Sequence, residues 1–416
     1  MRVLFTVFPA TAHVHPVVPL AWALQNAGHE VRVAIHPDTV HLATDAGLPA
    51  VPLGSREVLA DAVRWNDNFE MLDQLSDALS LDTGQADRWE QQWAGLTGML
   101  RLFTPMLDDL VDLCRRWRPD LVVWDPFCVA AAVAARVTGA AHARFLWGQD
   151  NIGWLRSKSL ERLAGPDGAG LVDPVSALMR PMLEKYDLEY DEELLLGQWT
   201  IDPMPAALRL PLDIRYEPIR RIPYNGTAVC PDWLNGRPER PRICLTLGIG
   251  GRGRQLFRES GVSFPEVVAG LAEMDVEVVA TLHRDLIASV GTVPDNVRLV
   301  EYVPLTYLLP TCSAIIHHGG GGTFAAAVAA RVPQLIVPMP FWSEATTGQF
   351  LADSGAGLLV DCAEFSVDLL RKQVGRLLDD PAFTAGAEAL HRETSQARSP
   401  HEMVAVLETL TARHSG

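Results

Sequence analysis

Residues 2–35, RVLFTVFPATAHVHPVVPLAWALQNAGHEVRVAI, contain the pattern that decides the fold. Arg2–Phe8 is a short apolar run with the composition of a buried strand. Apolar residues at helical spacing follow from Pro16 to Ala27, and Gly28 ends the expected helix. The run Val31–Ile35 is the next expected strand. A strand, a helix and a second strand in this order predict a parallel sheet with helices on both faces.

The same alternation continues along the rest of the chain. In the first half we expect strands at Leu121–Trp124 and Ala141–Trp147, with a helix at Val129–Val137 between them. The final segment, residues 381–413, has a helical pattern only. The predicted fold class is α/β, with two doubly wound parallel sheets whose ligands bind at the carboxyl ends of the strands. The strands expected in the second half are 242–247, 276–282, 297–303, 314–316 and 334–337.

A proline-rich stretch marks the expected domain boundary. Six prolines from Pro211 to Pro241 interrupt the periodic pattern, and proline breaks both helices and sheet ladders. We therefore predict an N-terminal domain over residues 1–215, a linker over 216–240 and a C-terminal domain over 241–416. Residues 55–118, which carry Trp65, Trp89, Trp93 and Trp117, and residues 154–196 read as helical inserts. These inserts either complete the core, line a pocket for a large apolar ligand or dock a partner protein.

Composition excludes several classes of function. The chain has 35 Lys and Arg against 51 Asp and Glu, a net charge of −16, which argues against nucleic-acid binding. No apolar run reaches the roughly 18 residues of a membrane span, and the N-terminus lacks a signal-peptide pattern, so we expect a cytoplasmic protein. The six cysteines form no Cys-x-x-Cys, and no Asp-x-Asp occurs, so we expect no metal and no resident cofactor.

The glycine-rich stretch His317–Thr323, HHGGGGT, is the strongest functional signal. It follows the expected strand Ala314–Ile316 and precedes the expected helix Phe324–Ala330. Four glycines let the backbone wrap closely around a ligand, and a helix N-terminus favours a phosphate or diphosphate. The stretch is not a Walker loop, because no Gly-Lys-Ser/Thr ends it. The alternative is a tight turn without a ligand.

Two further signals follow strands of the N-terminal half. His13 lies just after the first strand, where a histidine is well placed to act as a general base, and His15 is the competing candidate. Asp125 follows the strand Leu121–Trp124, and a carboxylate there can orient and stabilise an imidazole. The alternative roles are packing for the histidine and helix capping for Asp125, and capping is compatible with catalysis.

Residues 248–253, GIGGRG, fit the dinucleotide-binding pattern only in part. Such a site also needs a carboxylate at the end of the next strand, and Ala280–His283 has none. We interpret the loop as lining the ligand cleft through Gly248, with Arg252 or Arg254 near a bound phosphate.

The glycine-rich motif resembles the diphosphate-binding signature of family 1 nucleotide-sugar glycosyltransferases with the GT-B fold, two Rossmann-like domains facing across a cleft. Members from antibiotic-producing bacteria carry HHGGAGT here, so Gly321 replaces their alanine. The resemblance covers most of the chain and implies that the last helix returns to the N-terminal domain. It also implies a diphosphate site formed by His318, Gly320, Gly321, Gly322 and Thr323.

The resemblance also bears on the donor. Residues 300–309, which include Val303, are similar to the segment that holds the nucleotide base. Ala326 stands where plant members have a glutamate on the ribose hydroxyls, and Ser343-Glu344 replaces the Asp/Glu-Gln pair that holds sugar hydroxyls. Both departures favour a TDP-deoxysugar donor. Sequence drift or a one-residue shift of the alignment is the alternative.

The resemblance implies an inverting, metal-independent glycosyltransferase that moves a deoxysugar to a polyketide-type aglycone. His13 would deprotonate the acceptor and Asp125 would orient His13. The phrases Leu20–Leu24, Ala27–Val33 and Trp147-Gly148 are similar to macrolide, anthracycline and angucycline enzymes. Several of these work with a P450-like auxiliary protein, for which residues 60–118 are the expected docking site. Three functions remain as alternatives: C-glycosylation of an aromatic carbon, nucleotide-sugar epimerisation and nucleotide-sugar binding without catalysis. The sequence also leaves open a homodimer.

Overall fold

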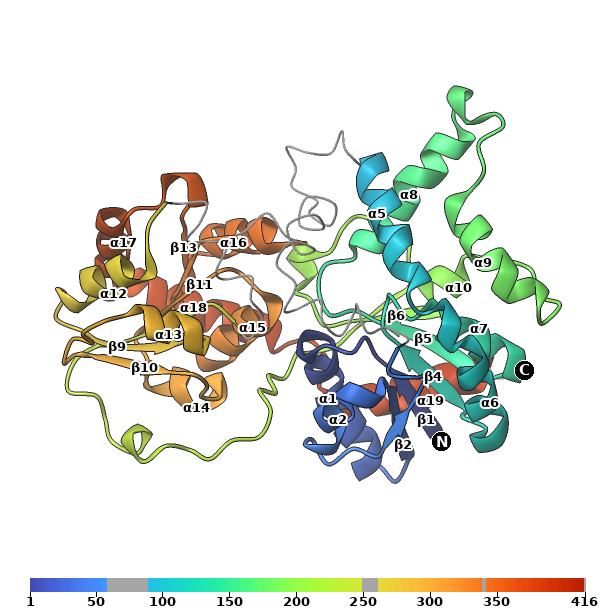
Figure 1. Ribbon diagram of the computed structural model, residues 1–416, viewed down its shortest axis with the longest axis horizontal. Helices are drawn as coiled ribbons and strands as arrows, with labels where there is room; N and C mark the ends of the chain where they lie inside the picture. The colour runs from blue at the N-terminus through green and yellow to red at the C-terminus, as the bar shows by residue number, and fades with distance from the viewer. Residues whose placement is uncertain (58–88, 249–260, 339–341, 415–416) are drawn as a thin grey trace. The chain divides into compact units, whose positions relative to one another are not determined.

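The computed structural model describes residues 1–57, 89–248, 261–338 and 342–414, which form two compact units. The described part of unit 1 consists of residues 1–57, 89–221 and 397–414. The described part of unit 2 consists of residues 222–248, 261–338 and 342–396. In Figure 1, unit 1 holds the blue to green elements together with the red C-terminal helix, so both ends of the chain belong to it.

Unit 1 is built on a seven-stranded sheet in the order β3-β2-β1-β4-β5-β6-β7, with every neighbouring pair parallel. From β1, strands β2 and β3 are added toward one edge of the sheet, and strands β4 to β7 are added toward the other edge. The strand order therefore reverses between β1 and β4. The carboxyl ends of these two strands therefore form the topological switch point, where ligands bind in open α/β sheets. The strands are β1 (Arg2–Thr6), β2 (Glu30–Ile35), β3 (Ala50–Pro52), β4 (Leu121–Trp124), β5 (Ala141–Phe145), β6 (Trp199–Asp202) and β7 (Tyr216–Pro218).

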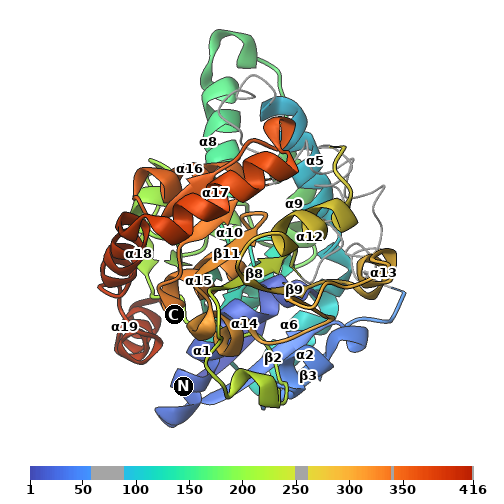
Figure 2. The same ribbon diagram turned by 90° about the vertical axis from the view of Figure 1, so that its left-hand side faces the viewer.

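Helices cover the sheet of unit 1 on both faces. Helix α7 is alanine-rich and buried from Val129 to Ala135, because it packs between α6 and strands β4 and β5. Helix α8 extends away from the sheet in both views (Figures 1 and 2). The helices are α1 (Thr11–Asn26), α2 (His41–Thr44), α5 (Trp89–Arg101), α6 (Leu107–Trp117), α7 (Val129–Thr138), α8 (Asn151–Ala164), α9 (Pro174–Glu184), α10 (Glu193–Leu196) and α19 (Pro400–His414).

Unit 2 has a six-stranded parallel sheet in the order β10-β9-β8-β11-β12-β13, which reverses between β8 and β11. Alternate residues of its strands face two apolar clusters: Ile243 lies in one and Cys244 in the other. The strands are β8 (Arg242–Thr246), β9 (Glu277–Thr281), β10 (Val297–Val300), β11 (Ala314–His317), β12 (Gln334–Ile336) and β13 (Gly357–Leu359). The helices are α12 (Phe264–Ala272), α13 (Arg284–Ser289), α14 (Leu305–Leu308), α15 (Gly321–Ala330), α16 (Glu344–Asp353), α17 (Val367–Asp379) and α18 (Pro381–Thr394).

The predicted fold class, α/β with doubly wound parallel sheets, is confirmed in both units, but the predicted linker needs a correction. Tyr216–Pro218, expected to begin the linker, is strand β7 and pairs with β6. Proline is tolerated there because β7 is an edge strand of the described sheet, and edge strands are where proline occurs in sheets. The sequence patterns also gave no indication of β3, β6 and β13.

The chain returns to unit 1 through α19, which packs against α1. Nε2 of His29 lies 3.1 Å from Oε1 of Glu408, and the ring of Trp199 lies 5.5 Å from that of His414. Leu407, on the inner face of α19, is fully buried.

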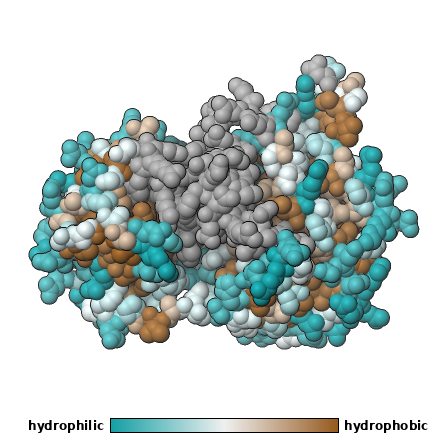
Figure 3. All heavy atoms as spheres, in the orientation of Figure 1, coloured by the Kyte–Doolittle hydropathy of each residue, from teal (hydrophilic) through white to brown (hydrophobic). Residues whose placement is uncertain are grey.

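Hydrophilic and hydrophobic residues are mixed over the coloured part of the face shown in Figure 3. Exposed apolar side chains of unit 1 include Leu160 on α8, and Leu171 and Val172 between α8 and α9. Within the part of the chain that the structure describes, no helix combines the length and apolar character that a membrane span requires.

Candidate active site

The switch point of unit 1 carries a buried histidine–carboxylate pair. Strands β1 and β4 are held together there by a hydrogen bond from the Asp125 N–H to the Thr6 carbonyl, 2.9 Å long. Helix α1 begins at Thr11, so His13 stands in its first turn. Nδ1 of His13 lies 2.7 Å from Oδ2 of Asp125, and the two residues are 9% and 4% exposed. Parallel pairing of β1 with β4 thus brings together two residues 112 positions apart in the chain.

The hydrogen bond selects one form of the imidazole. Asp125 accepts two hydrogen bonds, one from His13 and one, on Oδ1, from the Phe127 N–H at 3.0 Å. An ionised carboxylate can only accept, so Nδ1 of His13 carries the proton and the lone pair is on Nε2. This tautomer is assigned from the contact. An imidazole held in this way can take a proton at Nε2 while the carboxylate stabilises the resulting charge.

Aromatic side chains enclose His13. The ring centroids of Trp147, Phe8 and Phe127 lie 4.4, 4.8 and 5.8 Å from that of the imidazole. Phe8 follows β1, Phe127 follows β4 and Trp147 follows β5. The sequence marks Trp147 only as a point of likeness to the family. Its position just after a strand was the available signal, but an indole carries no titratable group that would single it out.

The alternatives for this region were His15 as the base and Asp125 as a helix cap. His15 is half-buried and lies two positions beyond His13 on α1, and residues with that spacing point to different faces of a helix. The residue that caps α7 is Cys128, not Asp125. The Asp125 carboxylate instead holds the turn before α7 through the Phe127 N–H.

In unit 2 the glycine-rich stretch links β11 to α15 at the switch point. The first backbone hydrogen bond of the helix runs from the Phe324 N–H to the Gly320 carbonyl and is 3.0 Å long. The N–H groups of Gly321, Gly322 and Thr323 precede it and therefore have no acceptor inside the helix. Together with the helix dipole they form a site suited to an anion such as a diphosphate.

His318 fits between two glycines. A Cβ atom on Gly248 would lie 2.9 Å from Cε1 of His318, and one on Gly320 would lie 2.6 Å from its Nε2. Larger residues would displace the ring at both positions. Nε2 of His318 also lies 3.6 Å from Oε1 of Glu344, the first residue of α16. The structure thus brings four of the predicted donor-site residues together: Gly248, His318, Gly320 and Glu344.

His317, the other histidine of the motif, is buried and hydrogen-bonded at both ring nitrogens. Its Nδ1 accepts a hydrogen bond from the Gly319 N–H at 3.1 Å, so Nε2 carries the proton and donates to Oε1 of Gln334 at 2.9 Å. Burial lowers the pKa of His317 to about 4. The ring is therefore neutral at pH 7 and holds the glycine loop on the sheet.

The remaining predicted donor-site residues lie in different surroundings. Val303 and Ala326 are both buried in one apolar cluster of unit 2, so Val303 can reach a ligand only through its backbone. Ser343 directly precedes α16, and its carbonyl accepts a hydrogen bond from the Thr347 N–H at 2.8 Å. Arg252 and Arg254 lie outside the described residues. Among the described residues, no three His, Cys, Asp or Glu side chains are grouped as metal ligands.

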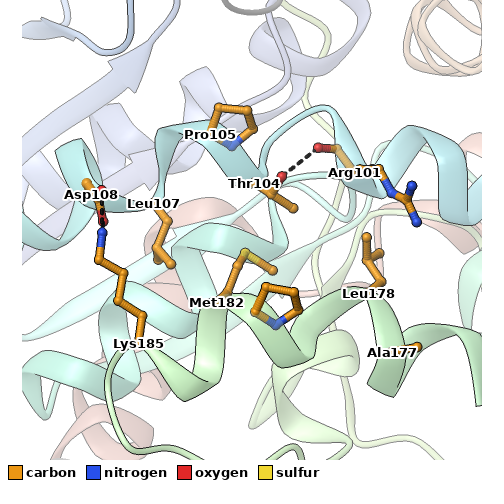
Figure 4. A pocket seen from close by; sticks show the side chains of 10 residues that line it. Arg101, Thr104, Pro105, Leu107, Asp108, Ala177, Leu178, Met182 and Lys185 are labelled. Carbon is orange, nitrogen blue, oxygen red and sulfur yellow. Dashed lines mark hydrogen bonds and ion pairs between the residues drawn. The ribbon is translucent and has the colours of Figure 1, made fainter.

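Unit 1 also has an open groove of about 550 Å³ between the start of α6 and helix α9 (Figure 4). Apolar side chains from both elements face it, including Leu107, Leu178 and Met182. One end carries the ion pair of Lys185 and Asp108, with 2.6 Å between Nζ and Oδ2. Neither His13 nor Asp125 lines this groove.

Two family-specific domains match the chain. The domain described as "Erythromycin biosynthesis protein CIII-like, N-terminal domain" matches residues 22–248. The corresponding C-terminal domain matches residues 265–410. Between them they cover most of both units.

Relatives match over the whole length. The aclacinomycin-T 2-deoxy-L-fucose transferase of Streptomyces galilaeus is 42% identical, with 100% of this chain and 97% of the relative aligned. The 10-deoxymethynolide desosaminyltransferase of Streptomyces venezuelae is also 42% identical, with 100% and 98% aligned. The solved structure of the glycosyltransferase VinC in complex with DTDP is 37% identical, with a TM-score of 0.86 over 99% of this chain and 100% of VinC. The chain therefore belongs to the EryCIII-like family of antibiotic deoxysugar glycosyltransferases and has their GT-B fold.

Proposed function

We propose that this glycosyltransferase moves a deoxysugar from a TDP-sugar to a hydroxyl group of a polyketide-type aglycone, with inversion at the anomeric carbon. The observation that carries the proposal is the buried contact between His13 and Asp125 at the switch point of unit 1. The names of the relatives support the substrate classes, because they are transferases of deoxysugars to such aglycones.

The proposed reaction is a single displacement. Nε2 of His13 takes the proton of the acceptor hydroxyl as its oxygen forms a bond to the anomeric carbon. The bond from that carbon to the diphosphate oxygen breaks at the same time, and the electron pair leaves with TDP. Attack opposite the leaving group inverts the configuration. Asp125 stabilises the imidazolium that forms, which is the role of the carboxylate in other histidine-based sites.

We propose that the diphosphate is bound without a metal ion. The N–H groups of Gly321, Gly322 and Thr323, the dipole of α15 and the His318 side chain offer positive potential and hydrogen-bond donors at one place. These groups would stabilise the charge that builds up on the leaving diphosphate. Ala326 offers no carboxylate for a ribose hydroxyl, which supports a thymidine nucleotide.

Calorimetric binding of TDP and UDP to the purified chain tests the donor side, with EDTA in one series and Mg²⁺ in another. We expect TDP to bind more tightly than UDP, with the same affinity in both series. A preference for UDP would contradict the argument from Ala326. Binding that needs Mg²⁺ would contradict the metal-free diphosphate site.

Variants at His13 test the base. His13→Ala should abolish transfer from a TDP-deoxysugar to macrolactone and anthracyclinone acceptors while TDP still binds, because the residue lies in the other unit from the diphosphate site. General base catalysis by a histidine contributes about 10²–10⁴-fold. His15→Ala is the matched control and should keep most of the activity. Unchanged transfer by His13→Ala would move the role to His15.

We also propose that a P450-like auxiliary protein docks on residues 60–118, of which 60–88 lie outside the described residues and the rest include α5 and α6. The groove between the start of α6 and helix α9 supports this, because it offers apolar side chains beside an exposed ion pair. The chain co-expressed with the auxiliary protein should turn over faster than the chain that is expressed and purified alone. Full turnover by the chain alone would overturn the proposal.

A further inference from the structure

Trp147 contacts His13 and belongs to a segment that is held in place by hydrogen bonds. Its ring centroid lies 4.4 Å from that of His13, at an interplanar angle of 48°. Nη1 of Arg221 donates to the Trp147 carbonyl at 2.8 Å. Two residues further on, Nε2 of Gln149 donates to the Leu208 carbonyl at 2.8 Å. The indole therefore belongs to a segment that is held by hydrogen bonds to Arg221 and Leu208.

A buried polar network anchors the end of the same segment. The Asp150 carboxylate forms an ion pair with Arg144, a fully buried residue of β5. It also accepts hydrogen bonds from the Tyr216 hydroxyl at 2.7 Å and from the Gly153 N–H at 2.9 Å. Buried polar groups that are satisfied in this way make a segment rigid. Residues 147–150 thus form a stiff support beside the proposed base.

We infer that Trp147 is a positioning residue for the base: its indole holds the His13 ring and stabilises the imidazolium that forms when His13 accepts the acceptor proton. This inference rests on the proposed function, because stabilising the imidazolium affects the reaction only if His13 takes up a proton.

The physical basis is the charge distribution of the indole. An aromatic face attracts a cation within about 6 Å of its centroid, tryptophan more than phenylalanine, by roughly 0.5–1 kcal/mol or more when water is excluded. Phe8 and Phe127 help to exclude water from the imidazole. The interaction favours the protonated ring, so it would stabilise the imidazolium that forms when His13 takes the proton of the acceptor.

Other charged groups in the surroundings have separate partners. Asp125 is bonded to His13 and would remain so in a Trp147 variant. Arg144 and Asp150 are paired with each other, and Nη1 of Arg221 donates to the backbone carbonyl of Trp147. Replacing the indole therefore changes one influence on His13 and leaves these charges in place.

The test is a pH titration of His13 by NMR, read from the imidazole Cε1–H signal and assigned with His13→Gln. Trp147→Leu keeps an apolar contact but removes the aromatic face, so the titration midpoint of His13 should fall by about half a pH unit. Trp147→Phe retains a weaker aromatic face and should lie between Trp147→Leu and the parent chain. Trp22→Leu, which removes a partly exposed tryptophan of α1, is the control and should leave the midpoint unchanged.

A midpoint that stays the same or rises in Trp147→Leu would overturn the inference. The acid limb of the pH profile of kcat/KM should move with the NMR midpoint, whereas a purely structural role would lower activity without moving it. Failure of the proposed function has a different signature, because His13→Ala would then retain transfer whatever Trp147 does. If Trp147→Leu does not fold, the shift in Trp147→Phe alone decides, and no shift there would count against the inference.

Discussion

The Nε2–H of His317 donates a hydrogen bond to Oε1 of Gln334, which joins β11 to β12 directly below the glycine loop. His318, the next residue, instead fits between Gly248 and Gly320. The two adjacent histidines of the motif therefore have different tasks. His317 holds the loop on the sheet, and His318 lies beside the proposed diphosphate site.

Gln334→Leu should destabilise unit 2 by about 1–3 kcal/mol, because it leaves the buried Nε2–H of His317 without its acceptor. Urea unfolding followed by fluorescence measures this change. Gln349→Leu is the control: it removes an exposed glutamine of α16 whose Nε2 donates to Oδ1 of Asp353, and it should change stability by less than about 0.5 kcal/mol. Equal stability of the two variants would contradict a structural role for His317.

The stability of the chain should decrease as the pH falls below about 6.5. Burial lowers the pKa of His317 to about 4 and that of His142 to about 3, where Arg136 adds to the effect of burial. Below the ordinary histidine pKa of about 6.5 the unfolded chain binds protons that the folded chain does not, so unfolding becomes easier. Thermal unfolding at pH 7.5, 6.5, 5.5 and 4.5 measures the slope. His142→Phe should reduce that slope, and an unchanged slope would contradict the assignment.

Gly320→Ala should weaken TDP binding at least about tenfold. The backbone φ of Gly320 is −58°, which alanine adopts without strain, so only the added Cβ matters. It would lie 2.6 Å from Nε2 of His318 and force the ring to move. Gly375→Ala, in the middle of α17 with nothing within 4 Å of the new Cβ, is the matched control and should keep full TDP affinity. Tight TDP binding by Gly320→Ala would remove His318 from the donor site.

Asp125→Asn should lower kcat by about 10²–10⁴-fold with little effect on TDP affinity. The amide keeps the shape of the carboxylate but loses the charge that favours the imidazolium of His13. Asp120→Asn is a suitable control, because Asp120 is exposed and precedes the amino end of β4. Single-turnover transfer from a TDP-deoxysugar gives kcat separately from binding, and an Asp125→Asn enzyme as fast as the control would rule out the proposed pairing.

The sequence predicts the central parts of this fold better than its edges. Strands such as β1 and β4 lie between neighbours and helices on both faces, so they are continuous apolar runs. Strands β3, β7 and β13 are three-residue strands at sheet edges, and the sequence pattern indicates neither them nor the interior strand β6. Their pairing depends on the neighbouring strand, and this information is not local in the sequence.

The same reasoning explains what could be inferred about the site. His13, Asp125 and His318 each follow a strand, and the carboxyl ends of parallel strands meet at one edge of a sheet, so polar residues there were good candidates. The roles of the aromatic rings around His13 were not predictable, because an apolar residue after a strand is usually core. The fit of His318 between Gly248 and Gly320 places its ring against a glycine about 70 positions earlier in the chain, which spacing alone does not give.

The return of the chain to unit 1 has a practical consequence for building hybrid enzymes. The chain leaves unit 1 after Arg221 and re-enters it at Ala397, and these two crossings lie side by side: the Arg220 N–H donates to the Arg398 carbonyl at 2.7 Å. Unit 2 is thus a cassette inserted between two adjacent points of unit 1. A chimera with one junction near residue 221 would pair a foreign α19 with this α1, whereas two junctions, near 221 and 397, would exchange the cassette and keep the native contact of His29 with Glu408.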